Sequence, residues 1–427
     1  MTFRITERYN DADLKQEAPM KLYSRENYLK KIRGFYNADD IIKVITGVRR
    51  CGKSSLMATI ADEIRQSGVP EENLIYIDLD LRPNKGIKTA DQLEALILKK
   101  GNTQGRKYLF VDEIQNVTGF EAVINGFRTE GDWSIFITGS NSYLLSGELV
   151  TKLTGRYIEF EMFPLSFEEY EEMKQFYGKE INTNPLLELN AYITEGGFPR
   201  AMFFDTLADK RRYVMGVIDE IFEKDIRKRV KIRSRETFET VMRFVVNNFG
   251  AAASLRNLCN ALNKAGTAVT LNTVARYVKA LVDAKILYEC PRFDLKSKRS
   301  LQGEKKYYIS DLSFYFAENI DNRINFGPVL ENIVFVYARS RDYSVSVGRI
   351  GKFECDFILR DTKLSYSYVQ VAYTISNRET EDREYRALES IKDNYPKYVM
   401  TTDYLLQKRS GIAHVNLIDF MRSGQLF

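Results

Sequence analysis

The stretch that decides the fold is a glycine-bracketed loop between an apolar segment and a helix-like one. It reads Gly47-Val48-Arg49-Arg50-Cys51-Gly52-Lys53-Ser54, followed by Ser55. Residues 41–46 before it form an apolar, β-branched run that favours a strand, and residues 55–61 after it are typical of a helix. A strand, a loop of the form G-x-x-x-x-G-K-[ST] and a helix form the context in which this motif binds phosphate groups.

The residue types of this loop suit the phosphates of a nucleotide. Gly47 and Gly52 let successive backbone N–H groups turn inward, and the helix N-terminus adds partial positive charge. We expect Lys53 to reach the β- and γ-phosphates and the Ser54 hydroxyl to ligate Mg²⁺. The whole segment 47–55 is therefore predicted to bind nucleotide. The alternative is a chance match in a strand–turn–helix unit.

A second apolar run, Tyr108-Leu109-Phe110-Val111, ends in two carboxylates, Asp112 and Glu113. Asp112 is placed to hold Mg²⁺, and Glu113 to orient or deprotonate the water that attacks the γ-phosphate. Strands often end in solvated acids, so this pattern alone is weak. Together with the phosphate loop it predicts a nucleoside triphosphatase.

Composition narrows the class of protein. The chain has 427 residues, of which 44% are apolar and 28% charged, with a net charge of +5, as expected of two or three globular domains. The four cysteines form no C-x-x-C pair, and a single histidine, His414, excludes multi-histidine metal sites. No apolar run reaches the roughly 18 residues that cross a bilayer, and the N-terminus lacks a signal-peptide core. We expect a cytoplasmic protein.

Strand-like and helix-like segments alternate from residue 41 to about residue 160, which predicts an α/β unit with a mainly parallel sheet covered on both faces. Ser140 and Asn141 follow a fourth predicted strand and are candidates to contact the attacking water or the γ-phosphate; capping of the next helix is the alternative. Arg156 is a candidate to contact phosphate in cis or across the interface of a homo-oligomer, with a structural ion pair as the alternative.

Residues 25 to about 400 resemble a prokaryotic AAA-family ATPase with a C-terminal domain of unknown function, within the P-loop class that includes the STAND signalling ATPases. The segments that carry the likeness are GVRRCGKSS, YLFVDEIQ, ITGSNSYLLS, LTGRYIEFEMFPLSFEEY and Gly196-Gly197-Phe198-Pro199. The resemblance implies an ASCE-type sheet, a helical lid over about residues 164–225, and ATP rather than GTP as the nucleotide. It also implies that Gly197 and Pro199 pack beside the adenine, although a helix stop and turn has the same spacing.

Beyond the lid, seven basic residues lie between Lys224 and Arg235 against one acid, Asp225. Such a run is either a solvated linker or a surface for an acidic partner. Three predicted helices and a two-stranded ribbon then follow, which is winged-helix organisation. DNA contacts would come from the residues Thr270, Asn272, Thr273, Arg276, Lys279, Lys298 and Arg299. Winged helices also dock proteins, so both partners stay open.

The last third looks like a restriction-endonuclease-type α/β fold that has lost its site. Asp356 lies on one strand, but Gln370 and Ala372 stand where such nucleases place Glu-x-Lys on the next. Gln cannot supply a carboxylate to Mg²⁺, and Ala cannot replace the lysine. Glu331 and Glu354 are further acids of the region. We expect a domain that binds or packs, without nuclease activity.

These segments predict four parts: an ATPase core with an N-terminal arm (1–163), a lid and basic linker (164–235), a winged helix (236–324) and a degenerate nuclease-like domain (325–427). Two functions follow. One is an ATP-driven switch or motor that acts on nucleic acid; the other is a signalling or assembly ATPase that docks a protein partner.

Overall fold

The computed structural model of the chain describes residues 21–139, 153–297, 299–319 and 324–427. Its N-terminal unit is a five-stranded sheet, in which every strand pairs in parallel with its neighbours. The order is β2 (Leu74–Asp78), β3 (Lys107–Asp112), β4 (Trp133–Thr138), β1 (Ile42–Gly47) and β5 (Tyr157–Met162). The predicted α/β unit with a parallel sheet is confirmed, and β1 and β3 coincide with the apolar runs that begin at residues 41 and 108 to within one or two residues.

Helices cover both faces of this sheet because its strands are apolar on both sides. The helices are α1 (Glu26–Ile32), α2 (Lys53–Gln66), α3 (Ala90–Lys100) and α4 (Phe120–Glu130). α1 and α2 pack on the face that carries Phe110 and Phe136, while α3 and α4 pack on the face that carries Leu109 and Val111. The helix expected after Ser140 and Asn141 begins outside the described residues.

A helical segment follows the sheet, as the resemblance implied. It contains α6 (Phe167–Phe176), α7 (Pro185–Glu195) and α8 (Leu207–Ile221), and it ends in a π-helical turn, Phe222–Ile226. Ser166 caps α6 with a full capping box, and Thr206 caps α8, so each start is fixed by a local polar side chain. We call this segment, residues 164–226, the lid.

The C-terminal part is built on one mixed sheet of nine strands. Its order is β13 (Lys408–Arg409), β14 (Ile412–Asn416), β12 (Lys397–Thr401), β11 (Tyr366–Val371), β10 (Phe353–Arg360), β9 (Ser344–Ile350), β7 (Leu287–Asp294), β8 (Arg299–Ile309) and β6 (Ala252–Ala253). Its helices are α9 (Arg235–Asn247), α10 (Leu255–Lys264), α11 (Leu271–Asp283), α12 (Ser313–Glu318), α13 (Phe326–Ser340), α14 (Arg378–Glu389) and α15 (Leu417–Arg422).

The elements expected between residues 236 and 309 are present in the expected order: α9, α10, α11 and the antiparallel pair β7–β8. The assignment of this segment as a winged helix stays a prediction. The boundary expected at residue 324, however, does not separate two sheets. β7 pairs in parallel with β9, with Phe293 opposite Gly348, so the ribbon continues into the C-terminal sheet.

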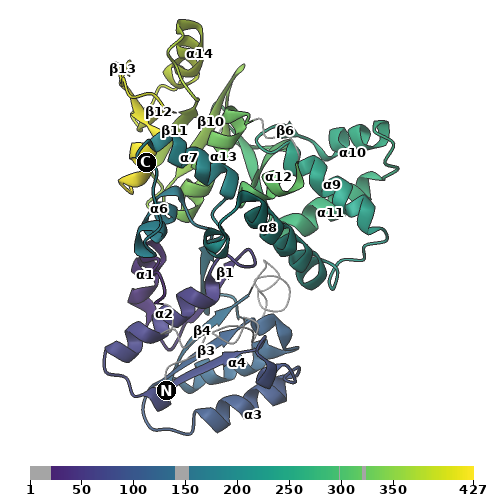
Figure 1. The fold of residues 1–427 in the computed structure, drawn as a ribbon, viewed down its shortest axis with the longest axis vertical. Coiled ribbons are helices and arrows are strands. Elements are labelled where there is room, and N and C mark those ends of the chain that lie inside the picture. Colours follow the sequence, from purple (N-terminus) through teal and green to yellow (C-terminus); the bar gives the residue numbers. More distant parts are fainter. Residues whose placement is uncertain (1–20, 140–152, 298, 320–323) are drawn as a thin grey trace.

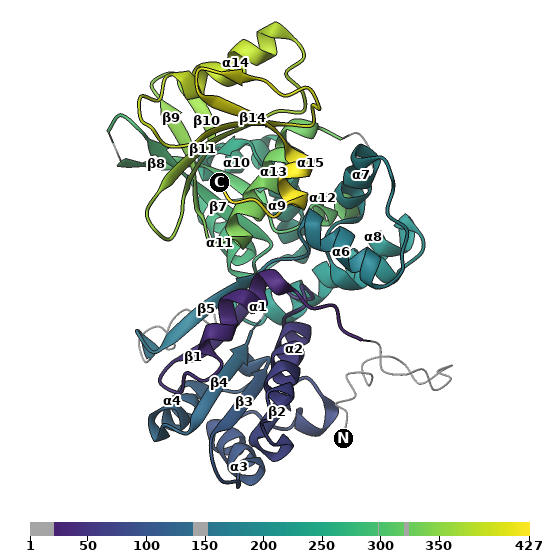
Figure 2. The ribbon, with the colours of Figure 1, turned by 90° about the vertical axis from the view of Figure 1, so that its left-hand side faces the viewer.

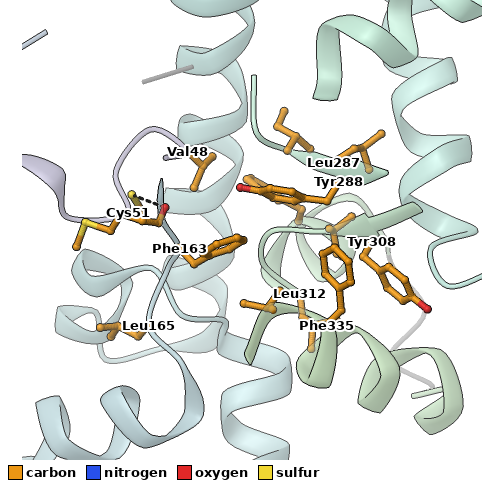
Figure 3. Packing of buried hydrophobic residues seen from close by; sticks show 14 of the residues in the cluster. Val48, Cys51, Phe163, Leu165, Leu287, Tyr288, Tyr308, Leu312 and Phe335 are labelled. Carbon is orange, nitrogen blue, oxygen red and sulfur yellow. Dashed lines mark hydrogen bonds between the residues drawn. The ribbon is translucent and has the colours of Figure 1, made fainter. Parts of the chain in front are cut away.

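The N-terminal sheet and the C-terminal sheet lie at opposite ends of the molecule, and the lid helices α6 and α8 lie between them, while α7 lies at the level of the C-terminal sheet (Figures 1 and 2). A single apolar cluster joins them. Val48 and Cys51 of the phosphate loop are buried in this cluster, and the ring of Phe163 lies 5.1 Å from the ring of Tyr288 on β7 (Figure 3). The loop therefore rests on the C-terminal part as well as on its own sheet.

Polar contacts accompany this apolar junction. Glu161, on β5, accepts hydrogen bonds from Arg339 at 2.8 Å and Tyr288 at 3.3 Å, and it forms an ion pair with Lys285 at the end of α11. In the described part of the chain, no helix combines the length and hydrophobicity that a membrane span requires.

Candidate active site

The phosphate loop runs from the end of β1 to the first turn of α2, as predicted. Gly47 has φ +144°, and a Cβ there would lie 2.1 Å from the Met162 carbonyl oxygen of the neighbouring strand β5. Gly52, just before α2, has φ +110°. Both glycines are thus required by the backbone, Gly47 also by its close approach to β5.

Lys53 is buried at the start of α2, and its ammonium group is directed back at the loop. Its Nζ donates hydrogen bonds to the carbonyl oxygens of Gly47 at 3.0 Å and Val48 at 3.1 Å. The ammonium group is therefore already held over the loop that is expected to surround the phosphates.

Of the nine residues in the segment 47–55, four have side chains that turn away from the loop's interior. Val48 and Cys51 are buried in the apolar junction. Arg49 and Arg50 extend to the lid, where Arg49 contacts Asp225 and Arg50 contacts Glu220 at 2.9 Å. These four residues can serve a phosphate group only through their backbone N–H groups.

Asp112 and Glu113 lie at the carboxyl end of β3, the edge of the sheet to which the phosphate loop belongs. Asp112 is completely buried and accepts a hydrogen bond from the Thr138 hydroxyl at the end of β4. The Glu113 N–H donates to the same hydroxyl oxygen at 3.0 Å. Glu113 has φ +58°, a left-handed conformation that is uncommon outside glycine and frequent at functional sites.

The Glu113 carboxyl group is held by polar neighbours in a buried setting. Gln115 donates a side-chain hydrogen bond to it, and the nearest guanidinium nitrogen of Arg49 lies 3.7 Å away. Burial raises the pKa of Glu113, and the charges of Arg49 and Lys53 oppose that rise. The net pKa of Glu113 is raised, so the effect of burial exceeds that of these two charges, and the carboxyl group is shielded from solvent.

Ser54 and Asp112 offer a hydroxyl and a carboxylate, which are oxygen donors of the kind that Mg²⁺ prefers. Ser54 lies in the first turn of α2, and its backbone carbonyl accepts from the Tyr76 hydroxyl of β2 at 3.5 Å. α2 packs against β1, β3 and β4, which brings that turn to the edge where Asp112 lies. The donor set fits a magnesium-bound triphosphate.

One contact was not predicted from the sequence: Arg25, just before α1, is buried and braces the loop. Its guanidinium donates to the carbonyl oxygens of Cys51 at 3.1 Å and Phe163 at 2.8 Å, and it pairs with Glu169 of α6. Nothing in the local sequence around Arg25 marks this role, because its partners lie more than a hundred residues away apart from Cys51.

The comparisons with known proteins agree with this geometry. A family model described as an AAA domain matches residues 39–171, and another described as a domain of unknown function, DUF8612, matches residues 186–322. An uncharacterized protein of Haemophilus influenzae is 34% identical over 404 residues, which cover 94% of this chain and 98% of that protein. The chain belongs to this family of AAA-domain proteins. The expected AAA-type, P-loop class is confirmed.

Two further relatives are more distant. An uncharacterized protein of Methanocaldococcus jannaschii is 30% identical over 367 residues, covering 82% of this chain and 79% of that protein. Among solved structures, the Walker-type ATPase PABY2304 of Pyrococcus abyssi is 15% identical, with a TM-score of 0.48, over 70% of this chain and 96% of that one.

The structure does not bring Arg156 to the AAA phosphate loop of the same chain. Arg156 directly precedes β5, whose first residue, Tyr157, lies opposite Ile42 at the start of β1. The loop begins at the other end of β1, five residues along a strand that rises about 3.3 Å per residue. The prediction of a contact in cis is wrong for this reason, and a contact across an interface stays a prediction. Ser140 and Asn141 lie outside the described residues.

Gly197 and Pro199 contact different parts of the structure. Pro199 Cγ lies 3.8 Å from the position a Cβ would take at Gly52, so it borders the phosphate loop. The Gly197 N–H instead donates to Asp311 at 2.7 Å, and a Cβ on Gly197 would lie 2.3 Å from the Leu165 carbonyl oxygen. The contacts of Gly197 thus join the lid to the C-terminal part. Adenine contacts of Gly197 and Pro199 stay predictions.

Some of the candidate DNA-contacting side chains are exposed, and several already form ion pairs within the chain. Asn272, Arg276 and Lys279 are exposed on α11, and Lys279 forms an ion pair with Asp283 at 2.5 Å. In the basic run, the side chains of Lys224, Arg227 and Arg235 each form ion pairs with acids of α8, its π turn or α9. Lys298 lies outside the described residues.

A cavity of about 560 Å³ lies beside the C-terminal sheet. Its lining includes Glu331, Glu354, Asp356, Gln370 and Ala372. These five residues, singled out from the sequence, are therefore brought together, with Glu331 in the second turn of α13. Burial raises the pKa of Asp356, and the nearby Glu331 raises it further.

A lysine contacts two acids of this cavity, and the sequence reasoning missed it. Lys306 of β8 places its Nζ 3.0 Å from a carboxylate oxygen of Glu331 and 3.0 Å from one of Glu354. Its ammonium group thus lies between the two acids. Among the described residues, no group of three or more metal-ligating side chains has the arrangement of a metal site.

Proposed function

We propose that the chain is an ATP-hydrolysing switch, in which the AAA domain binds and cleaves ATP and the lid passes its nucleotide state to the C-terminal part. The observation that carries this proposal is the meeting of phosphate loop and carboxylate: Arg49 of the loop lies 3.7 Å from the Glu113 carboxylate at the end of β3. Buried charged groups that lie close together at the carboxyl edge of a parallel sheet indicate a reaction site.

Each side chain then has a chemical task. Lys53 exchanges its bonds to the Gly47 and Val48 carbonyl oxygens for bonds to phosphate oxygens, which neutralises charge that develops as the γ-phosphate leaves. Glu113 orients the attacking water and accepts its proton. Ser54 and Asp112 would hold Mg²⁺, which supplies charge neutralisation at the phosphates.

The partner follows from what the C-terminal part exposes. Nucleic acid is our first proposal, because α11 presents Asn272 and Arg276 on an exposed face and the β7–β8 ribbon follows it directly. A protein partner is the second, because three of the seven basic side chains in the run 224–235 are already neutralised by ion pairs within the chain. Basic side chains that already pair with acids of the chain contribute less to binding the phosphates of a nucleic acid.

One experiment separates the two partners. ATP turnover is measured with and without duplex DNA, and DNA affinity is measured over a range of salt. A nucleic-acid partner predicts stimulated turnover and a log–log salt slope of about −0.9 for each phosphate contacted. The variant Arg276→Glu should weaken binding and flatten that slope, whereas Lys99→Glu, on the exposed face of α3, should not.

The outcomes are distinct. ATP turnover with no DNA binding at low salt supports the protein-docking alternative and leaves the ATPase proposal standing. Wild-type protein that neither binds nor hydrolyses ATP contradicts the proposal as a whole.

A further inference from the structure

Three carboxylates from two parts of the chain surround one arginine of the phosphate loop. Arg49 donates to both oxygens of Asp225, at 2.9 Å from Nε and 3.0 Å from Nη2. Its other terminal nitrogen, Nη1, lies 3.7 Å from Glu113 and 3.8 Å from Glu220. Arg49 is 6% exposed and Asp225 is 2% exposed, so this is a buried fork rather than a surface ion pair.

The partner of this fork has an unusual backbone. Asp225 lies in the π-helical turn Phe222–Ile226, which directly continues α8. Turns of this kind cost stability and occur frequently at functional sites. The π turn places Asp225 against the loop while Lys224, its neighbour, pairs with Glu220 at 2.8 Å and approaches Asp80 after β2 at 3.7 Å.

The same turn also packs against the C-terminal part. The ring of Phe222 lies 5.2 Å from the ring of Phe238 on α9, and Phe238 lies 5.3 Å from Tyr277 on α11. A movement of the π turn would therefore displace Arg49 on one side. On the other side it would displace α9 and α11, the second of which carries the exposed residues Asn272 and Arg276. α8 itself packs on α12.

We propose that Arg49 is a positioning residue that sets the Glu113 carboxylate for hydrolysis, and that Asp225 holds Arg49 in place only while the π turn is docked. Hydrolysis, rather than nucleotide binding, then depends on how the lid and the C-terminal part are seated. The inference rests on the proposed ATPase function and adds the route by which a partner would regulate it.

The geometry predicts a separation of kcat from binding. The Arg49 side chain points from the loop to the lid, so Arg49→Ala should leave the Kd for a fluorescent ATP analogue within about threefold. Loss of its support for Glu113 should lower single-turnover hydrolysis by roughly 10- to 100-fold. Asp225→Asn, which keeps the shape and removes the charge, should lower hydrolysis in the same direction.

A double-mutant cycle tests whether the two residues act as one unit. If Asp225 acts through Arg49, the double variant Arg49→Ala/Asp225→Asn should hydrolyse ATP about as fast as Arg49→Ala alone. Arg49→Lys keeps the charge but cannot form the two-bond fork, and it should recover only part of the rate. Arg212→Ala, which removes an exposed ion pair at the other end of α8, is the matched control and should keep wild-type turnover.

Thermal unfolding of each variant shows whether it is folded, and Asp225→Asn and Arg49→Lys remain informative if Arg49→Ala does not fold. Independent, multiplicative effects of the two substitutions would overturn the coupling, and so would a loss of ATP affinity equal to the loss of rate. Either result, obtained with active wild-type protein, leaves the ATPase proposal intact. Inactive wild-type protein contradicts the ATPase proposal instead.

Discussion

At the scale of single residues, the burial of charge explains why certain side chains are where they are. Lys43 is the second residue of β1, in an otherwise apolar run, and its side chain is fully buried. Its ammonium group donates to the Ala38 carbonyl oxygen at 2.6 Å and to the Ser134 hydroxyl at 2.9 Å, and it lies 4.6 Å from the Phe136 ring centre. These contacts fasten the start of β1, and hence the phosphate loop at its end, to β4.

Lys43 should make stability depend on pH. Burial lowers the pKa of Lys43 from 10.5 to about 7, so between these values the unfolded chain binds a proton there that the folded chain does not. The free energy of unfolding should therefore rise with pH across this window, by up to about 1.4 kcal/mol per pH unit from this group.

The comparison with Lys43→Met isolates this contribution. Urea unfolding of both proteins at pH 7 and pH 9 should show the wild type gaining stability relative to the variant at the higher pH. A difference that is the same at both pH values would mean that Lys43 keeps its ordinary pKa in the folded protein.

Lys53 makes a second prediction at this scale. Its only described hydrogen bonds are to two carbonyl oxygens of the loop, so Lys53→Ala should change the melting temperature little. It should abolish productive ATP binding, because the cation over the β- and γ-phosphates is lost. Titration with a fluorescent ATP analogue measures this, and wild-type affinity together with wild-type turnover would refute the site.

At the scale of elements, local sequence patterns predicted the strands and helices. They did not predict contacts between residues that lie far apart in the sequence. The phosphate loop and the Asp112–Glu113 pair were predictable because strand, loop and helix signals lie next to the functional residues. The fork between Arg49 and Asp225 was not, since the two residues are 176 positions apart and Asp225 stands out only as the single acid of a basic run. The pairing of β7 with β9 was missed for the same reason.

The C-terminal cavity gives a prediction that depends on three elements together. Gln370 on β11 supplies no carboxylate, and Lys306 of β8 is engaged by Glu331 and Glu354 rather than free beside a metal-bound water. Purified protein should therefore leave supercoiled, linear and single-stranded DNA intact with Mg²⁺ or Mn²⁺, with or without ATP.

The control for that experiment is Asp356→Ala. Asp356 accepts a hydrogen bond from the Val371 N–H at 2.8 Å, which orients it toward β11 in the cavity. Cleavage by wild-type protein that disappears in Asp356→Ala would show that a working nuclease site exists, with Lys306 as the lysine that the sequence pattern lacked.

At the scale of the whole molecule, the nucleotide site packs directly against the C-terminal part and is not connected to it through the chain alone. Val48 and Cys51 of the loop share an apolar cluster with β7 and α13 (Figure 3). Glu161 of β5 forms ion pairs with Lys285 and Arg339, which lie beyond the lid in the chain. In a chain built in this way, a change at the phosphates can alter how the N-terminal sheet and the C-terminal part pack against each other.

The central claim is that the AAA domain hydrolyses ATP with Glu113 as the residue that activates water. Glu113→Gln tests it most directly, because the amide keeps the shape of the side chain but is a poor proton acceptor. With bound ATP in a single turnover, the variant should retain nucleotide and hydrolyse it roughly 100-fold or more slowly than the wild type. A single-turnover rate equal to that of the wild type, at equal ATP occupancy, would contradict the account.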